Sequence, residues 1–272
     1  DVQRLLQRGQ NHVRLKNGKM AVFDSGLLDE FNTVLRDCNP EQKQPGRYRI
    51  GQAHAGYLEA SVSDAGFQLN AAPSWRSWAQ RQRGQAELRP VPLGDLEPVM
   101  RPYQKYGTAW LHFLASNGLG GILADDMGLG KTLQMLAFLR SQKGPSLVVC
   151  PSSLVFNWKR EADKFTPERK VLVLEGPGRG ALFARIPESD LVITSYPLLR
   201  RDAERYRAFR FSTVVLDEAQ HIKNPDTQNA QAAAILRADR KFILTGTPIE
   251  NSVRDVWSLM NFVMPGYLGD RD

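Results

Sequence analysis

The sequence has 272 residues, of which 42% are hydrophobic and 24% are charged. This composition is typical of a globular protein with one large domain or two modest ones, and no apolar run approaches the roughly 18 residues of a membrane helix. The formal net charge of +7 favours contact with polyanions, although a basic surface without a specific partner fits equally well. The two cysteines and four histidines show no zinc spacing. Because cysteines are so few, we expect a cytoplasmic, reducing environment, and without a long apolar run we expect no membrane contact.

The N-terminal part, residues 1–90, differs from the rest and predicts a small α+β accessory domain. Residues 12–23 resemble a β-hairpin around Asn17-Gly18, with Val13 opposite Val22, and a helix is expected to follow Ser25. Residues 74–84 combine two tryptophans with three arginines; packing of an amphipathic helix is favoured over stacking on nucleic acid. A proline-rich linker, 91–99, then leads to a second domain, 100–272.

From residue 100 onward, helical and strand-like segments alternate along the chain. The predicted helices are 102–116, 131–141, 153–164, 227–237 and 252–263. The predicted strands are 121–125, 146–150, 170–174, 190–194, 213–217 and 241–245. Strands interleaved with helices favour an α/β fold with a mostly parallel sheet that helices flank on both faces.

The segment GILADDMGLGKT, which ends at Thr132, has the layout of a phosphate-binding P-loop between a strand and a helix. Glycines let the backbone approach the phosphates of ATP, the lysine adds a full charge, and Thr132 is a candidate Mg²⁺ ligand. One position departs from the usual motif, because Asp125 stands where the first glycine is expected. The predicted nucleotide-binding residues of the loop are Asp126, Met127, Gly128, Leu129, Gly130, Lys131 and Thr132.

A second motif, FSTVVLDE, supplies the acidic residues that a P-loop enzyme needs. Its apolar run is typical of a parallel strand buried on both faces, and two carboxylates follow at the carboxyl end, where ligands of open α/β sheets bind. We predict that Asp217 holds Mg²⁺ and that Glu218 orients and activates the attacking water.

Five further motifs accompany the P-loop in a characteristic order. They are RPYQKYGTAWL (101–111), LVVCPSSLVFNW (147–158), ITSYPLL (193–199), LDEAQHIKN (216–224) and LTGTPIEN (244–251). With them, residues 100–269 resemble the first RecA-like lobe of superfamily 2 helicase-type motors, and in particular the Swi/Snf family of ATP-dependent DNA translocases, bacterial type. The family's P-loop commonly carries an acidic residue at the position of Asp125.

The resemblance implies roles for several residues. Gln104 would bind the adenine edge, since one amide offers both a donor and an acceptor, and Gln220 would sense the γ-phosphate. Small polar residues after two strands would bind DNA phosphates, although loop capping is the alternative use of the same groups. These predicted DNA-binding residues are Pro151, Ser152, Ser153, Thr194, Ser195 and Tyr196. Thr245, Gly246 and Thr247 would couple the nucleotide site to the DNA path.

The resemblance therefore implies an ATP- and Mg²⁺-dependent motor on double-stranded DNA that remodels protein–DNA complexes, with RNA polymerase or another DNA-bound protein as a partner, in the bacterial cytosol or nucleoid. A second RecA-like lobe should supply an arginine finger, so we expect this chain alone to bind nucleotide weakly and to hydrolyse it little. Two alternatives remain: an RNA helicase lobe, which expects DEAD and SAT where this chain has DEAQ (217–220) and TGTP (245–248), and a regulatory nucleotide-binding or protein-docking module.

Overall fold

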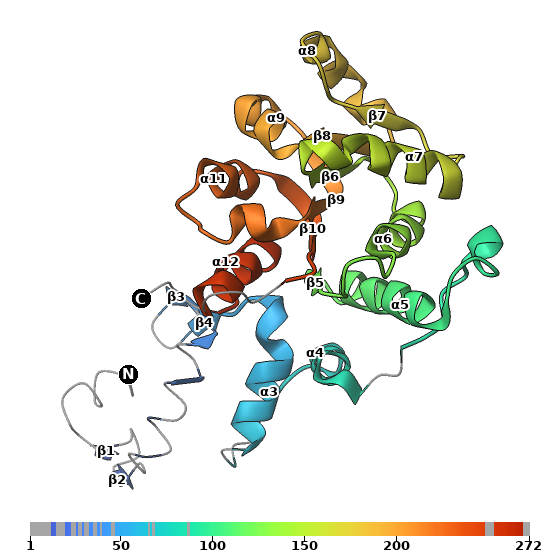
Figure 1. The fold of residues 1–272 in the computed structure, drawn as a ribbon. Helices are drawn as coiled ribbons and strands as arrows, with labels where there is room; N and C mark the ends of the chain where they lie inside the picture. Colours follow the sequence, from blue (N-terminus) through green and yellow to red (C-terminus); the bar gives the residue numbers. More distant parts are fainter. Residues whose placement is uncertain are drawn as a thin grey trace. The chain divides into compact units, whose positions relative to one another are not determined.

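The computed structural model divides into two compact units, residues 1–87 with 266–272 and residues 88–265 (Figure 1). It describes residues 12–14, 20–22, 26, 29, 33–34, 37–38, 40–44, 47–64, 66, 69–85, 88–247 and 253–268. The predicted assignment of functional domains to 1–90 and 100–272 stays a prediction.

The unit that contains the N-terminal residues combines short hairpins with helices. Strand β1 (His12–Arg14) pairs with β2 (Met20–Val22), and β3 (Glu41–Gln44) pairs with β4 (Arg47–Arg49), both antiparallel. The predicted register of the first hairpin is wrong by one residue, because Val13 lies opposite Ala21 rather than Val22. Arg14 pairs with Met20, whereas the register expected from a two-residue turn at Asn17-Gly18 would have placed Leu15 opposite Met20.

Two helices of this unit pack through apolar side chains. They are α3 (Ala55–Asp64) and α4 (Pro73–Gln80), and a π-helical turn, η2 (Arg81–Gln85), follows α4. Trp78 is buried beside Ala55, and the half-buried Trp75 packs on the same cluster, so the tryptophan face packs as the amphipathic pattern predicts. The helix predicted after Ser25 lies largely outside the described residues.

In the second unit, the described residues include six parallel strands that form one sheet, in the order β5-β10-β9-β6-β8-β7. Their bounds are β5 Gly121–Leu123, β6 Ser146–Cys150, β7 Val171–Val173, β8 Leu191–Ser195, β9 Arg210–Asp217 and β10 Arg237–Leu244. Every predicted strand of this region is present, and the predicted α/β fold is confirmed. Because all strands run in one direction, their carboxyl ends and the loops that follow them share one edge of the sheet.

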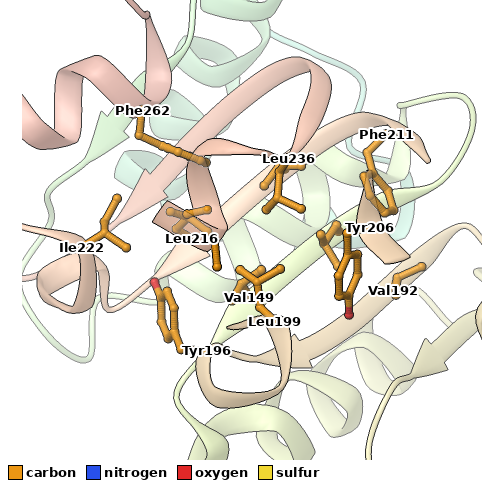
Figure 2. Packing of buried hydrophobic residues seen from close by; sticks show 14 of the residues in the cluster. Val149, Val192, Tyr196, Leu199, Tyr206, Phe211, Leu216, Ile222, Leu236 and Phe262 are labelled. Carbon is orange, nitrogen blue, oxygen red and sulfur yellow. The ribbon is translucent and has the colours of Figure 1, made fainter. Parts of the chain in front are cut away.

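Helices cover both faces of this sheet (Figure 1). On one face, α5 (Pro102–Ser116), α6 (Lys131–Arg140) and α7 (Val155–Phe165) pack on the side chains of Val148, Ile193 and Phe242. The other face is covered by α9 (Tyr196–Arg201), α11 (Gln228–Ala234) and α12 (Val253–Val263). Figure 2 shows this second layer, in which Leu216 of β9 lies among apolar side chains from the helices.

Short helical segments complete the unit. They are α8 (Arg179–Leu182), α10 (Ala203–Tyr206) and the 3₁₀ turns η3 (Gly94–Leu96), η4 (Ser152–Leu154), η5 (Phe183–Glu188) and η6 (Ala219–Ile222); η1 (Gln52–His54) belongs to the first unit. Residues 91–99, predicted as a linker, include Leu93 and Leu96, which are buried beside Leu133 of α6. None of the helices in the described part of the chain is long and apolar enough to cross a membrane.

The starts of β9 and β10 and the end of α11 differ from the predicted bounds for a common reason. Strand β10 begins at Arg237, four residues before the predicted 241, and pairs there with Arg210 of β9, which itself begins three residues before the predicted 213. The sequence RADRK carries too many charges to be recognised as a strand, yet its side chains are exposed or half-buried and thus avoid the cost of full burial. As a result, α11 ends at Ala234 and not at 237.

Candidate functional site

The P-loop connects β5 to α6 at the carboxyl edge of the sheet. Gly128 and Gly130 have φ angles of 83° and 73°, in the left-handed region that glycine enters without steric cost. Gly130 is also the residue that precedes α6, so the loop delivers its N–H groups and the positive end of the helix to one concave turn. This geometry fits the phosphates of a nucleotide, as the sequence motif predicts.

Lys131 spans the loop with its side chain. Its ammonium Nζ donates to the backbone carbonyls of Asp125 (2.7 Å) and Asp126 (3.1 Å), and the residue is buried. Neutral carbonyls hold the ammonium in place without neutralising it, so its charge remains available for a phosphate. Burial raises the pKa of Asp217, and the Lys131 charge opposes part of that rise, which places the two opposite charges in one electrostatic environment.

Gln104 lies against the same loop from α5. Its amide Nε2 donates to the Leu129 carbonyl at 3.1 Å, and its Oε1 accepts the N–H of Arg101 at 2.9 Å, which caps the helix. The hydroxyl of Tyr103 donates to the same Leu129 carbonyl, also at 3.1 Å. The structure therefore uses Gln104 to fix the loop, while its contact with adenine stays a prediction.

Asp217 ends β9 and is almost fully buried. Burial raises its pKa to about 6, and a hydrogen bond that Oδ2 accepts from the indole Nε1 of Trp158 at 2.8 Å opposes the rise. Oδ1 accepts the backbone N–H of Glu218 at 2.9 Å, and Tyr196 donates its hydroxyl to the Asp217 carbonyl at 2.8 Å. The carboxylate is thus held in one orientation by the Trp158 indole and the Glu218 N–H, while Tyr196 fixes the backbone carbonyl of the same residue.

Glu218 carries the strained backbone of the site. Among the described residues, it is the one non-glycine residue with positive φ (49°). Its Oε2 is buried, and no described group donates a hydrogen bond to it. A carboxylate with an open acceptor position is suited to orient a water molecule, and left-handed backbone at non-glycine residues is concentrated at functional sites. Gln220, in the turn η6 that follows, is exposed.

The predicted coupling residues follow β10 and contact the P-loop. The Thr245 N–H donates to the Leu123 carbonyl at 3.2 Å, and the Thr247 N–H donates to the Thr245 hydroxyl oxygen at 3.1 Å. A β-carbon added to Gly246 would lie 3.2 Å from the side chain of Met127. The structure therefore brings these residues directly beside the nucleotide loop, and their coupling role stays a prediction.

The predicted DNA-binding residues separate into two groups by exposure. Ser152 and Ser153 are exposed in the turn η4, which precedes α7, and Pro151 beside them is half-buried. Thr194, Ser195 and Tyr196 are buried, so their side chains face the interior of the unit in this conformation. Contact of either group with DNA stays a prediction.

An open cavity of about 440 Å³ lies beside both groups, at the carboxyl edge of the sheet. Ser152 and Ser195 contribute to its wall, together with Gly176, Arg179 and the exposed Arg201. Arg179 is paired with Asp202, at 2.5 Å, whereas no ion pair of Arg201 is formed within the described residues. The Ser152 hydroxyl and the Arg201 guanidinium are groups that bind phosphates of a nucleic-acid backbone, whereas Glu175, which also lines the cavity, carries a charge that opposes such binding.

The residues present fit ATP and Mg²⁺. Mg²⁺ prefers oxygen ligands and is usually held by one or two protein groups together with phosphate oxygens and water. The hydroxyl of Thr132 and the carboxylate of Asp217 are ligands of this type. No group of three or more metal-ligating side chains occurs in the part of the chain that the structure describes, so a metal ion would depend on the phosphates for its remaining ligands.

Sequence reasoning missed two contributions to this site. Sequence reasoning gave Trp158 no role in the site and expected Tyr196 to bind DNA, yet both donate hydrogen bonds to Asp217, Trp158 to the carboxylate and Tyr196 to the backbone carbonyl. The signal was an indole and a phenol that follow buried strands at the same sheet edge as the acidic motif. Aromatic side chains with a polar atom usually find a partner for it when they are buried.

Comparison with known proteins agrees with this geometry. A family model described as "SNF2-related domain" matches residues 103–272. A putative ATP-dependent helicase/translocase of Bacillus subtilis, YwqA, is 40% identical over 93% of this chain. A SWI2/SNF2 ATPase core from Sulfolobus solfataricus, solved in complex with double-stranded DNA, is 40% identical and superimposes with a TM-score of 0.62 over 67% of this chain.

The chain spans only part of these relatives, 29% of the B. subtilis protein and 39% of the S. solfataricus core. The matched segment contains the P-loop, the acidic motif and the residues that follow β10. It covers well over half of the chain, and the predicted resemblance is confirmed. The chain belongs to the SNF2-related family of ATP-dependent helicases and translocases and contains the first lobe of the ATPase core.

Proposed function

We propose that this chain binds ATP and Mg²⁺ as the first lobe of a motor that couples ATP hydrolysis to movement along double-stranded DNA. The observation that carries the proposal is the convergence of Lys131 and Asp217 at one sheet edge, beside residues that follow β6 and β10. A relative solved with double-stranded DNA supports the choice of nucleic acid. In the cell, the motor would act in the cytosol or nucleoid and displace proteins such as RNA polymerase from DNA.

Each residue of the site has a defined task in this proposal. The N–H groups of the P-loop and the Lys131 ammonium bind the β- and γ-phosphates, and Thr132 and Asp217 hold the metal ion. Bound Mg²⁺ neutralises charge that develops on the phosphate oxygens. Glu218 orients a water molecule toward the γ-phosphorus and accepts its proton, while the bond to the leaving ADP oxygen breaks.

Movement requires more than this lobe supplies. Gly246, which follows β10, lies close to Met127 of the P-loop, so a displacement of the loop would be felt at Gly246. A second lobe would close on the nucleotide and provide an arginine finger, which raises phosphoryl-transfer rates by roughly 10³–10⁵-fold. The isolated chain is therefore expected to bind nucleotide and to turn it over slowly.

Steady-state ATP turnover tests the proposal. This chain and the longer protein that contains it are assayed alone, with duplex DNA and with single-stranded RNA, and Lys131→Ala serves as the control. We expect stimulation by duplex DNA in the longer protein and loss of turnover in Lys131→Ala. Stimulation by RNA would favour an RNA helicase instead, and nucleotide binding without turnover in either protein would favour a regulatory module.

A further inference from the structure

The residue that replaces the first glycine of the P-loop has a partner on the following helix. Asp125 Oδ2 accepts a hydrogen bond from the side-chain amide Nε2 of Gln134, at 2.9 Å. Gln134 lies one turn into α6 and is fully buried. A buried amide that donates to a carboxylate makes a charge-assisted hydrogen bond, which is stronger than a bond between neutral groups.

The orientation of the Gln134 amide is set by this one contact. Its Oε1 is buried, and no described group donates to it. The amide points toward α5, where a β-carbon added to Gly107 would lie 2.0 Å from Oε1. Gly107 therefore provides the space that the amide occupies. Reversal of the amide would place its oxygen against the Asp125 carboxylate, so Nε2 faces Asp125.

Asp125 connects this pair to the phosphate-binding lysine. While its side chain is bound to Gln134, its backbone carbonyl accepts the Lys131 ammonium at 2.7 Å. Displacement of Asp125 would therefore move the carbonyl that holds Lys131. A glycine at the same position has no side chain with which to form such an anchor, so the acidic residue adds a connection that the usual motif lacks.

We propose that Gln134 is a positioning residue, which anchors the P-loop through Asp125 and thereby fixes Lys131 for phosphate binding. Gly107 takes part by making room for the amide. This inference rests on the proposed function, because it assumes that the loop binds a nucleoside triphosphate. It assigns a role to the one position at which the loop departs from the usual P-loop sequence.

A pair of exchanged groups tests the proposal. Gln134→Glu keeps the size of the side chain but sets a second carboxylate against Asp125, so the two repel each other and the loop is displaced. The double variant Asp125→Asn with Gln134→Glu has the same net charge as the wild type, and the new amide at 125 donates to the new carboxylate at 134. The affinity for ATPγS with Mg²⁺ is measured by isothermal titration calorimetry on the 272-residue chain.

We expect Gln134→Glu to weaken binding about tenfold or more, and the double variant to recover most of the loss. Unchanged affinity in Gln134→Glu would overturn the proposal. A double variant that binds no more tightly than Gln134→Glu would overturn it as well. Circular dichroism and thermal unfolding establish that each variant is folded. If wild-type protein fails to bind ATPγS, or Lys131→Ala binds as tightly as the wild type, the proposed nucleotide site itself is wrong.

Gly107→Ala provides a second and independent perturbation that leaves both hydrogen-bonding side chains intact. Alanine favours a helix more than glycine does, so a loss of affinity would reflect the displaced amide and not a weakened α5. The matched control is Gly178→Ala, where an added β-carbon meets no atom within 4 Å. We expect lower affinity in Gly107→Ala alone. Equal affinity in the two alanine variants would contradict the role given to Gly107 and Gln134.

Discussion

Asp217 makes the stability of the fold depend on pH in a direction that is unusual for a carboxylate. Its pKa rises from 3.8 to about 6 on folding, with burial as the largest cause. Between these values the folded state binds more protons than the unfolded state, so stability falls as pH rises through this window. A tenfold change in an ionisation constant corresponds to about 1.4 kcal/mol, and the ionised side chain therefore costs the fold about 3 kcal/mol at neutral pH.

The Asp217→Asn variant isolates this contribution, because its side chain does not titrate. Of the total cost, about 2 kcal/mol is expected to appear between about pH 4.5 and about pH 7.5. The free energy of unfolding of both proteins is measured by urea denaturation at each pH, without nucleotide or Mg²⁺. The variant should gain about 2 kcal/mol relative to the wild type over this interval.

The test depends on how the difference in unfolding free energy between variant and wild type changes with pH. The value of that difference at a single pH does not decide the question. An asparagine accepts only one of the hydrogen bonds from Trp158 and Glu218 and sets its amide against the other donor, which adds a cost that pH does not alter. Other carboxylates contribute equally to both proteins and cancel. A difference that stays constant across the interval would refute the raised pKa and with it the buried, desolvated setting of Asp217.

Three further substitutions test the site and the core. Trp158→Phe removes the indole donor to Asp217. We expect the affinity for ADP with Mg²⁺, measured by calorimetry, to fall several-fold, and the affinity for ADP without metal to change little. An equal loss of affinity in both conditions would contradict a specific role of Trp158 at the metal site. Gly130→Ala puts a β-carbon at positive φ and 2.5 Å from Gln104 Nε2, so ATPγS affinity should fall at least tenfold, and an unchanged affinity would show that the loop tolerates strain there. Phe138→Ala empties a fully buried site, and urea unfolding should show a loss of about 3–5 kcal/mol; a loss below about 1 kcal/mol would mean that α6 repacks.

The fold was predictable from the sequence because its signals are local. Apolar runs such as 213–217 identify strands buried on both faces, and the glycines of the P-loop mark a turn that few other residues permit. Strand β10 was harder to recognise, since its first residues are mostly charged and are exposed or half-buried, so they show no apolar run. The register of the first hairpin was wrong by one residue, because it was derived from the Asn17-Gly18 pair alone and the observed strand pairing differs from it.

The site was predictable only in part, since sequence patterns identify residues but not their partners. Lys131 and Asp217 were identified from motifs, but Trp158 lies 59 residues from Asp217 and only the fold brings its indole to the carboxylate. The amide of Gln104 likewise binds a distant residue, since it donates to the Leu129 carbonyl of the P-loop, 25 residues further along the chain. Hydrogen bonds between distant residues leave no regular spacing in the chain, so no periodicity or motif could reveal them.

The carboxyl end of β9 combines several energetically unfavourable features within two consecutive residues. Asp217 is a desolvated carboxylate, and Glu218 has a left-handed backbone and a buried oxygen without a hydrogen bond. Each feature costs free energy, and a substitution that relieved it would be expected to stabilise the fold. These features meet in two consecutive residues at one strand end, and the Asp217 carboxylate lies in the field of the Lys131 ammonium. Their coincidence indicates that this strand end is arranged for the chemistry of a bound phosphate group and not for stability.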